Sequence, residues 1–326
     1  MSIKISVVIP VYNIAPYLED CLTGVMDQSF KDYEVIIVND GSTDDSAEVA
    51  QALISGDDRF RIINIPHSGL SAARNTGISN AQGKYIYFLD GDDSIRKDTL
   101  QLLYSNAEAN DPDVILFSAC TFTDSINELK DSGEYRYNGH YEGVYSGSVL
   151  SEELVRNNDA HHCSSCMMMT RLDHLKENNL FFNEQLSYSE DSLMFIRLIP
   201  LSGRISVLDE PLYMRRYRNG SITTNTDSRT IINDMCTLYL DADAFINSTA
   251  GINTALPVWY LELFITTIMK NHEQLSVKDS LAIRSLQPHT LNMSVKRYKC
   301  FHSKRIALFM RSLLLYRLYS LLKNPK

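Results

Sequence analysis

Residues 84–93, KYIYFLDGDD, place three aspartates directly after a short apolar run that is typical of a buried strand. Three similar runs precede it, at 5–10 (ISVVIP), 33–40 (YEVIIVND) and 60–66 (FRIINIP). Helical stretches separate these runs, near Tyr17–Ser29, Thr43–Ile54 and Ser71–Ala81. This alternation of strand and helix predicts an α/β fold, in which a parallel sheet carries helices on both faces.

Ligands of open α/β sheets bind at the carboxyl ends of the strands. The residues in that position here are Val11–Asn13, Asp40–Ser42, Pro66–Gly69 and Asp90–Asp93. After Asp40, Gly41 permits a tight turn, and Ser42 or Thr43 can cap the next helix. A capped turn without a ligand is the simpler interpretation of that cluster when it is taken alone.

The aspartates Asp90, Asp92 and Asp93 crowd the end of one strand, and their charges repel one another unless they are neutralised. Mg²⁺ takes oxygen ligands, usually one or two carboxylates completed by waters and substrate phosphates. Because Asp is also common in turns and at helix N-caps, a purely structural role is the alternative. Three acids after one apolar strand lead us to favour a site for Mn²⁺ or Mg²⁺.

A third acidic cluster, Ser189-Glu190-Asp191, opens an apolar helical stretch. The helix dipole favours acids in a first turn, so this cluster is either structural or a general base fixed at a rigid helix start. Between the clusters, Arg74 lies in the first turn of a predicted helix, where an unpaired charge is out of place. We expect an anion such as a diphosphate, or a nearby acid, to pair with it.

The chain closely resembles the family 2 glycosyltransferases of the GT-A fold. The resemblance lies in the order and spacing of five strings, VVIPVYN, VNDGSTDDS, GLSAARNTG, FLDGDD and SED. The resemblance covers about residues 3–220, and it implies a Rossmann-like nucleotide-binding domain with a mixed sheet. We therefore expect a GT-A domain at 1–225, followed by a helical C-terminal region at 226–326. Within the GT-A domain, residues 1–110 would bind the nucleotide sugar and 111–225 would form the acceptor side.

The resemblance also implies roles for single residues. Asp191 would be the catalytic base with Glu190 as its neighbour, while Arg216 and Arg218 would contact the diphosphate. Asp90 and Asp92 would form the DxD motif that meets the metal, Pro10, Val11 and Tyr12 would line the base pocket, and Asp40 would hold the base. The residues implied to bind the nucleotide are Pro10, Val11, Tyr12, Asp40, Arg74, Asp90, Gly91 and Asp92.

The expected reaction is an inverting, metal-dependent transfer of one sugar from a UDP-hexose or UDP-N-acetylhexosamine. The acceptor would be a hydroxyl of a glycan or lipid-linked molecule in polysaccharide biosynthesis. Processive synthesis is not expected, because the sequence holds no QxxRW string and no apolar run long enough to span a membrane. The alternatives are a nucleotide-sugar-binding protein without catalysis and a sugar nucleotidyltransferase, although the Gly-rich basic loop of the latter does not follow the first strand.

Charge is distributed unevenly along the 326 residues. The net charge is −9, but ten Lys or Arg and no acid lie beyond residue 279, which leaves −19 on the residues before them. An acidic body does not suit nucleic acid. The basic, apolar tail at 296–326 predicts either a terminal helix packed on the body or peripheral contact with an anionic membrane. Without an expected signal peptide, we predict a cytoplasmic protein, at the inner face of the cell membrane in the second case.

A short Cys/His cluster contains His161, His162, Cys163 and Cys166. Cys-x2-Cys spacing can bind zinc, but adjacent residues of a strand point to opposite faces. We favour ordinary strand residues near the acceptor cleft. The six cysteines of the chain are expected to be free thiols.

Overall fold

The computed structural model describes residues 3–123, 141–160, 163–218 and 226–274. Within these ranges, one nine-stranded sheet has the order β3-β2-β1-β4-β8-β6-β9-β5, and β7 pairs with β9. The strands are β1 (Ile5–Val11), β2 (Tyr33–Asp40), β3 (Phe60–Ile65), β4 (Tyr85–Phe88), β5 (Ser94–Ile95), β6 (Val114–Phe122), β7 (Gly143–Tyr145), β8 (Met168–Arg171) and β9 (Ile205–Arg216). The helices are α1 (Ala15–Met26), α2 (Ser46–Leu53), α3 (Leu70–Asn80), α4 (Thr99–Asn110), α5 (Gly147–Arg156), α6 (Leu172–Glu177), α7 (Glu190–Leu201), α9 (Ser228–Ser248) and α10 (Ala255–Gln274).

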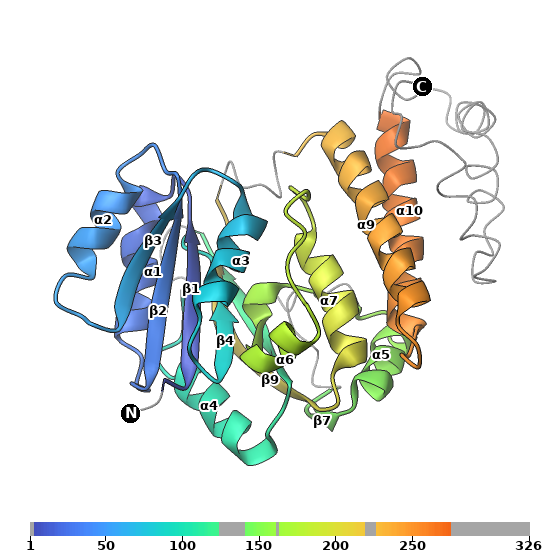
Figure 1. Ribbon diagram of the computed structural model, residues 1–326, viewed down its shortest axis with the longest axis horizontal. Coiled ribbons are helices and arrows are strands. Elements are labelled where there is room, and N and C mark those ends of the chain that lie inside the picture. Colours follow the sequence, from blue (N-terminus) through green and yellow to red (C-terminus); the bar gives the residue numbers. More distant parts are fainter. Residues whose placement is uncertain (1–2, 124–140, 161–162, 219–225, 275–326) are drawn as a thin grey trace.

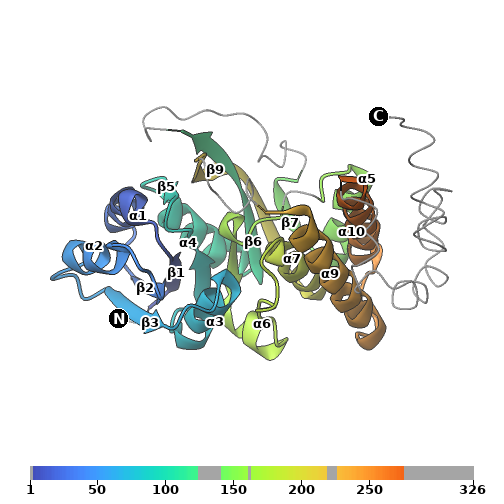
Figure 2. The ribbon, with the colours of Figure 1, turned by 90° about the horizontal axis from the view of Figure 1, so that it is seen from above.

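The first four strands form the predicted parallel part of the sheet. β1 runs parallel to β2 and β4, and β2 runs parallel to β3. Every residue of β1 and β2 is buried, as expected for strands covered on both faces. Seen from above, α1 and α4 lie on one side of the sheet, and α3 and α6 lie on the other (Figure 2). The carboxyl ends of β1, β2 and β4 therefore meet at one edge.

The second part of the sheet makes it mixed, which confirms the expected fold class. β8 lies antiparallel between β4 and β6, while β9 runs parallel to β6. Residues 165–170 begin as the 3-10 turn Ser165–Met167, where the Ser164 hydroxyl accepts from the amide of Cys166, and become extended from Met168. β9, which the sequence did not predict, shifts register against β6 near Ser118.

The helical C-terminal region is confirmed for residues 226–274. α9 and α10 lie side by side and contact α5 and α7 (Figure 1). Asp227 begins α9 by accepting hydrogen bonds from the backbone of Arg229 and Thr230. The division into domains stays a prediction.

Three sequence predictions can be compared with the structure only where it describes the chain. No helix within them is long and apolar enough to cross a membrane. Five cysteines lie in these ranges, and all are free thiols as expected. The tail at 296–326, and His161 and His162 of the Cys/His cluster, lie outside the described residues.

Candidate active site

The loop after β4 lies directly against the end of β1. A Cβ atom at Gly91 would lie 2.5 Å from Cδ1 of Ile14 and 3.1 Å from the carbonyl oxygen of Pro10. A side chain there would require the Ile14 side chain and the Pro10 carbonyl to shift, so glycine favours this close approach of the loop. The loop thereby presents Asp90 and Asp92, one on each side of Gly91, at the edge of the sheet where β1 and β4 both end.

Arg74 of α3 is buried, with 1% of its side chain exposed, and it binds three carboxylates. Its Nη1 donates to Oε1 of Glu190 at 2.8 Å and to Oδ1 of Asp191 at 2.9 Å. Its Nη2 donates to Oδ1 of Asp90 at 3.0 Å. The sequence left open whether Arg74 pairs with a diphosphate or with a nearby acid, and the structure shows pairing with nearby acids. One guanidinium thus joins the loop after β4 to the start of α7.

The charges of this cluster shift its pKa values. Burial alone lowers the pKa of Arg74, but Asp191, Asp90 and Glu190 raise it well above its ordinary value, so the guanidinium stays charged. Burial, together with the charge of Asp191, raises the pKa of Glu190 to about 7, although Arg74 acts in the opposite direction. Glu190 is therefore near its titration midpoint at neutral pH. Its neighbour Asp191 is the more accessible of the two carboxylates, at 21% exposure against 11%.

The basic segment at the end of β9, which holds Arg216 and Arg218, contacts the loop after β4. Nε of Arg218 donates to Oδ2 of Asp92 at 2.6 Å, and Nε of Arg216 donates to the carbonyl oxygen of Asp92 at 3.0 Å. Nη2 of Arg216 also donates to Asp20 at 2.5 Å. Both guanidinium groups lie over the ring of Tyr17, at 5.3 and 5.2 Å from its centroid. The two arginines are therefore paired beside the acidic loop and are not free surface charges.

Asp93, the third of the acids that follow β4, ties this segment to the loop. It accepts a hydrogen bond from the hydroxyl of Tyr213 and another, at 2.6 Å, from the backbone amide of Arg216. Burial raises the pKa of Asp93 well above its ordinary value, and the charges of Asp92 and Asp90 add to the shift. Asp93 thus holds β9 against the acidic loop.

A second group of polar residues lies at the ends of β2 and β3. Asp40 is buried, and its Oδ1 accepts from the amide of Ser68 at 2.7 Å, while its Oδ2 accepts from the amide of Gly69 at 2.9 Å. Oδ2 also lies 2.9 Å from Nδ1 of His67. The ring of His67 stacks on that of Tyr12, with centroids 4.0 Å apart. The two stacked rings are partly exposed, and Asp40 orients the ring of His67.

The turn after Asp40 explains why Gly41 is glycine. Its φ is +66°, and a Cβ atom would lie 2.8 Å from the backbone nitrogen of His67. Pro10 and Val11 are buried at the end of β1, so of the three residues expected to line the base pocket only Tyr12 presents an exposed side chain. His67 escaped notice in the sequence because it lies 27 residues from its carboxylate partner.

Helix α9 holds the loop that leads into α7. Oδ2 of Asp234, a buried residue of α9, accepts from the amide of Ser187 at 3.0 Å. Two turns further along α9, Asp241 accepts from the side-chain amide of Asn183 at 2.7 Å. The loop ends at Ser189, which has the left-handed φ of 63° and is the N-cap residue of α7. The orientation of Glu190 and Asp191 thus depends on contacts made by the C-terminal region.

The structure brings most of the predicted site residues together. Arg74 joins Asp90, Glu190 and Asp191 in one ion-pair network. On the same loop, Asp92 pairs with Arg218 and accepts a hydrogen bond from Arg216 through its backbone carbonyl. Cys166 adjoins this network, with its sulfur 3.9 Å from Nη2 of Arg74. Across the described ranges, no three His, Cys, Asp or Glu side chains group so as to hold a metal ion. The roles of these residues stay predictions.

Comparison with known proteins gives the class and then the family. The fold matches that of S. aureus TarS 1–349 in complex with UDP-GlcNAc, with a TM-score of 0.75 at 18% identity, over 97% of this chain and 88% of that one. The fold is therefore the GT-A fold. The model of the family described as glycosyl transferase family 2 matches residues 6–178, which is more than half of the chain. The chain belongs to glycosyltransferase family 2.

Two curated relatives are similar over about two thirds of this chain. The uncharacterized glycosyltransferase EpsJ of Bacillus subtilis is 32% identical over 67% of the chain and 62% of its own length. The glycosyltransferase GlyA of Streptococcus pneumoniae is 33% identical over 68% of the chain and 31% of its own length. The matched part of this chain thus spans less than two thirds of either relative.

Proposed function

We propose that this chain is an inverting glycosyltransferase, which transfers one sugar from a UDP-sugar to a hydroxyl of a glycan or lipid-linked acceptor. One observation carries the proposal: Arg74 joins Asp90 of the acidic loop to Glu190 and Asp191 at the start of α7. A donor-side carboxylate and a candidate base consequently lie within the span of one guanidinium group. Nucleophile activation and leaving-group stabilisation must act on a single reacting carbon, so this proximity is what transfer requires.

The proposal of a uridine nucleotide is supported by the solved relative of the same fold, TarS, which binds UDP-GlcNAc. In this chain, Tyr12 and His67 offer exposed rings on which a base can stack. Asp40 already accepts three hydrogen bonds, and two carboxylate oxygens provide about four acceptor sites, so one remains for the polar edge of a base. We therefore keep Tyr12 and Asp40 in the proposed base pocket and add His67.

A divalent cation fits the residues of the acidic loop. The side chains of Asp90 and Asp92 remain 33% and 20% exposed, so both carboxylates can be reached from solvent. One or two carboxylates suffice for Mg²⁺ or Mn²⁺ when substrate phosphates complete the coordination. Asp92, with Asp90, would hold the ion, and the bound ion would neutralise charge on the departing diphosphate. Arg218, which pairs with Asp92 in this structure, would then be released to contact the diphosphate.

The protein's own residues would activate the acceptor hydroxyl. Asp191 accepts the proton of the acceptor hydroxyl as the oxygen forms a bond to the anomeric carbon. The bond from that carbon to the diphosphate breaks on the opposite face, and the electron pair leaves with the nucleotide. A single displacement of this kind inverts the anomeric centre. Arg74 donates to Oδ1 of Asp191 through Nη1 and so restricts the orientation of the carboxylate that accepts the proton.

The experiment is a screen of UDP-, GDP-, CDP- and dTDP-sugars for hydrolysis or transfer, with Mn²⁺, with Mg²⁺ and with excess chelator. We expect turnover of a UDP-sugar that requires the cation, and NMR of the product should show inversion. Asp92→Ala should lose turnover while remaining folded. Donor binding without turnover under all conditions would favour the non-catalytic alternative, and release of diphosphate from a sugar phosphate and a nucleoside triphosphate would favour a nucleotidyltransferase.

A further inference from the structure

Arg197 is the one charged residue in the otherwise apolar part of α7 from Ser192 to Leu201. The residues on either side of it, 192–196 and 198–199, are buried, whereas Arg197 is half-buried. It lies six residues after Asp191, which is roughly 9 Å along the helix axis, and the proposed reaction does not use it. A charge retained on an apolar helix calls for a partner.

Inside the described ranges, Arg197 has no such partner. No hydrogen bond or ion pair joins its guanidinium group to another described residue. Burial lowers the pKa of Arg197, and the charge of Asp241 on α9 offsets only part of that effect. The five N–H donors of a guanidinium group are thus available to a ligand.

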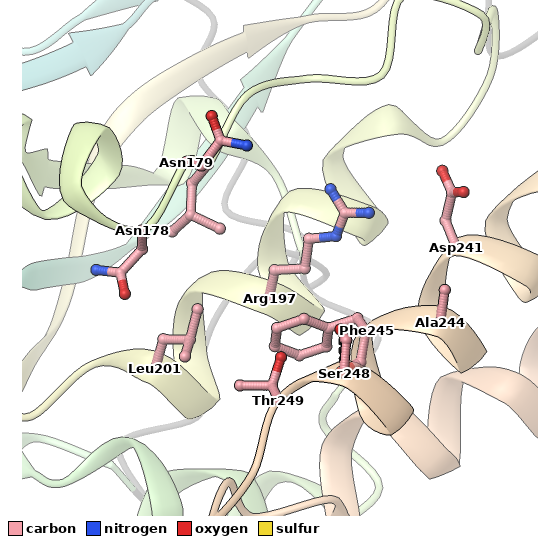
Figure 3. A pocket seen from close by; sticks show the side chains of 10 residues that line it. Asn178, Asn179, Arg197, Leu201, Asp241, Ala244, Phe245, Ser248 and Thr249 are labelled. Carbon is pink, nitrogen blue, oxygen red and sulfur yellow. Dashed lines mark hydrogen bonds between the residues drawn. The ribbon is translucent and has the colours of Figure 1, made fainter.

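The guanidinium group of Arg197 borders a pocket of about 390 Å³ between α7, the second half of α9 and the turn that follows α6. In the view of Figure 3, it points into the space between the side chains of Asn179 and Asp241. The volume lies within the range of roughly 300–1,000 Å³ that is usual for small-molecule sites. The lining residues are Asn178, Asn179, Leu180, Arg197, Leu201, Asp241, Ala244, Phe245, Ser248 and Thr249.

The polar groups of the pocket include both donors and acceptors. Oδ2 of Asp241 accepts from Asn183, which leaves Oδ1 to accept from a ligand. The side chains of Asn179 and Thr249 make no hydrogen bond to another described residue, and each can donate and accept. Because the charges of Arg197 and Asp241 have opposite signs, the pocket favours a neutral ligand over an anion.

The remaining walls are apolar, with Phe245, Leu180 and Leu201 beside the polar groups. A pyranose ring has a matching surface, because its hydroxyls both donate and accept while its C–H face is apolar. We infer that this pocket binds a pyranose unit of a glycan, at a site separate from the proposed reacting centre. Binding there does not depend on the transfer reaction.

The test is saturation-transfer NMR on the full chain, titrated with the methyl β-glycosides of glucose, galactose and N-acetylglucosamine. We expect at least one of them to bind. Arg197→Met and Thr249→Val should each weaken that binding, the first by about tenfold or more, since hydrogen bonds to a charged group are the stronger ones. Arg156→Met, at an exposed position of α5, should bind as wild type does, and so should Asp191→Asn, even if transfer proves absent.

Thermal unfolding of each variant separates loss of the pocket from loss of the fold. The inference is wrong if no glycoside binds the folded wild type, or if both pocket variants bind as well as wild type does. It is also wrong if inorganic phosphate or sulfate, but no glycoside, binds in a manner that Arg197→Met abolishes, because the pocket is then an anion site.

Discussion

Arg74 holds together residues that lie far apart along the chain. Its guanidinium group is 16 residues from Asp90 and 116 and 117 residues from Glu190 and Asp191. The planar fork of donors reaches three carboxylates at once, which a lysine ammonium with a single nitrogen cannot reproduce. Because the guanidinium group is buried, each carboxylate that it pairs depends on it strongly.

We predict that Arg74→Met destabilises the fold and abolishes transfer. Removing one member of a buried ion-pair cluster leaves uncompensated charges, which lowers the free energy of unfolding by roughly 3–5 kcal/mol. Denaturant unfolding measures this loss. Arg156→Met removes a mostly exposed arginine paired with Glu153 and should change the same quantity by less than about 0.5 kcal/mol. Equal effects of the two substitutions would contradict the structural role of Arg74.

The raised pKa of Glu190 predicts a pH-dependent stability. The pKa is about 7 in the folded chain and 4.5 in the unfolded one, so the folded state binds the additional proton between these values. Stability from this group is present in full below pH 4.5 and is lost as the pH rises through about 7. The loss relative to Glu190→Gln is at most about 3 kcal/mol. Unfolding measured from pH 4.5 to 8 in both proteins tests this, and parallel profiles would show that Glu190 titrates normally.

Among the secondary-structure elements, α9 holds the loop that precedes Glu190 and Asp191, although no residue of α9 belongs to the candidate site. Asp234 accepts a hydrogen bond from the backbone amide of Ser187. Ser187 lies two residues before Ser189, which has a left-handed backbone conformation, and four before Asp191. We predict that Asp234→Ala lowers kcat by about tenfold or more, because a base displaced by a fraction of an ångström is poorly aligned. Donor affinity, measured by calorimetry, should stay at the wild-type value.

The matched control is Asp243→Ala, also on α9 but outside this loop contact. A loss of donor affinity in Asp234→Ala equal to the loss of kcat would indicate general unfolding of the site. Restoration of kcat by Asp234→Asn, whose amide oxygen still accepts the bond, would support a positioning role.

Elements with continuous apolar runs could be predicted from the sequence. β1, β2, β3 and β4 are such runs, and the helices between them lie within a few residues of their expected positions. β9 was missed because Asp209, Glu210 and Pro211 interrupt its apolar pattern, a composition that is typical of a turn. The pairing of β9 with β6 supplies the stabilisation that its local sequence does not show.

The candidate site was predictable only where its signal is local. Asp90 and Asp92 are two residues apart after one strand, and Glu190 and Asp191 are adjacent at one helix start. The link between these pairs through Arg74 is a tertiary contact with no sequence periodicity. The same reason hid His67, Asp234 and the pairing of Asp93 with Tyr213, since these contacts span 27, 47 and 120 residues.

For the whole molecule, the uneven charge predicts peripheral contact of the basic tail with an anionic membrane. The tail at 296–326 holds nine Lys or Arg and no acid, and each basic residue near an anionic surface contributes about 1 kcal/mol. We predict that the full chain sediments with anionic liposomes, is released at high salt and ignores neutral liposomes. A chain ending at 295 should stay in the supernatant while keeping donor binding. Retention of the full chain in the supernatant would favour a tail that packs on the body.

Asp191 is the proposed base of the transfer reaction, and the measurement that tests this role most directly compares turnover with donor binding in Asp191→Asn. The amide cannot take up the proton, so turnover of the UDP-sugar found in the screen should fall by about 10²–10⁴. Calorimetry should give an unchanged donor affinity, and Asp173→Asn, an exposed acid in the first turn of α6, should leave both quantities at wild-type values. Near-normal turnover by Asp191→Asn, together with its loss in Glu190→Gln, would contradict the assignment.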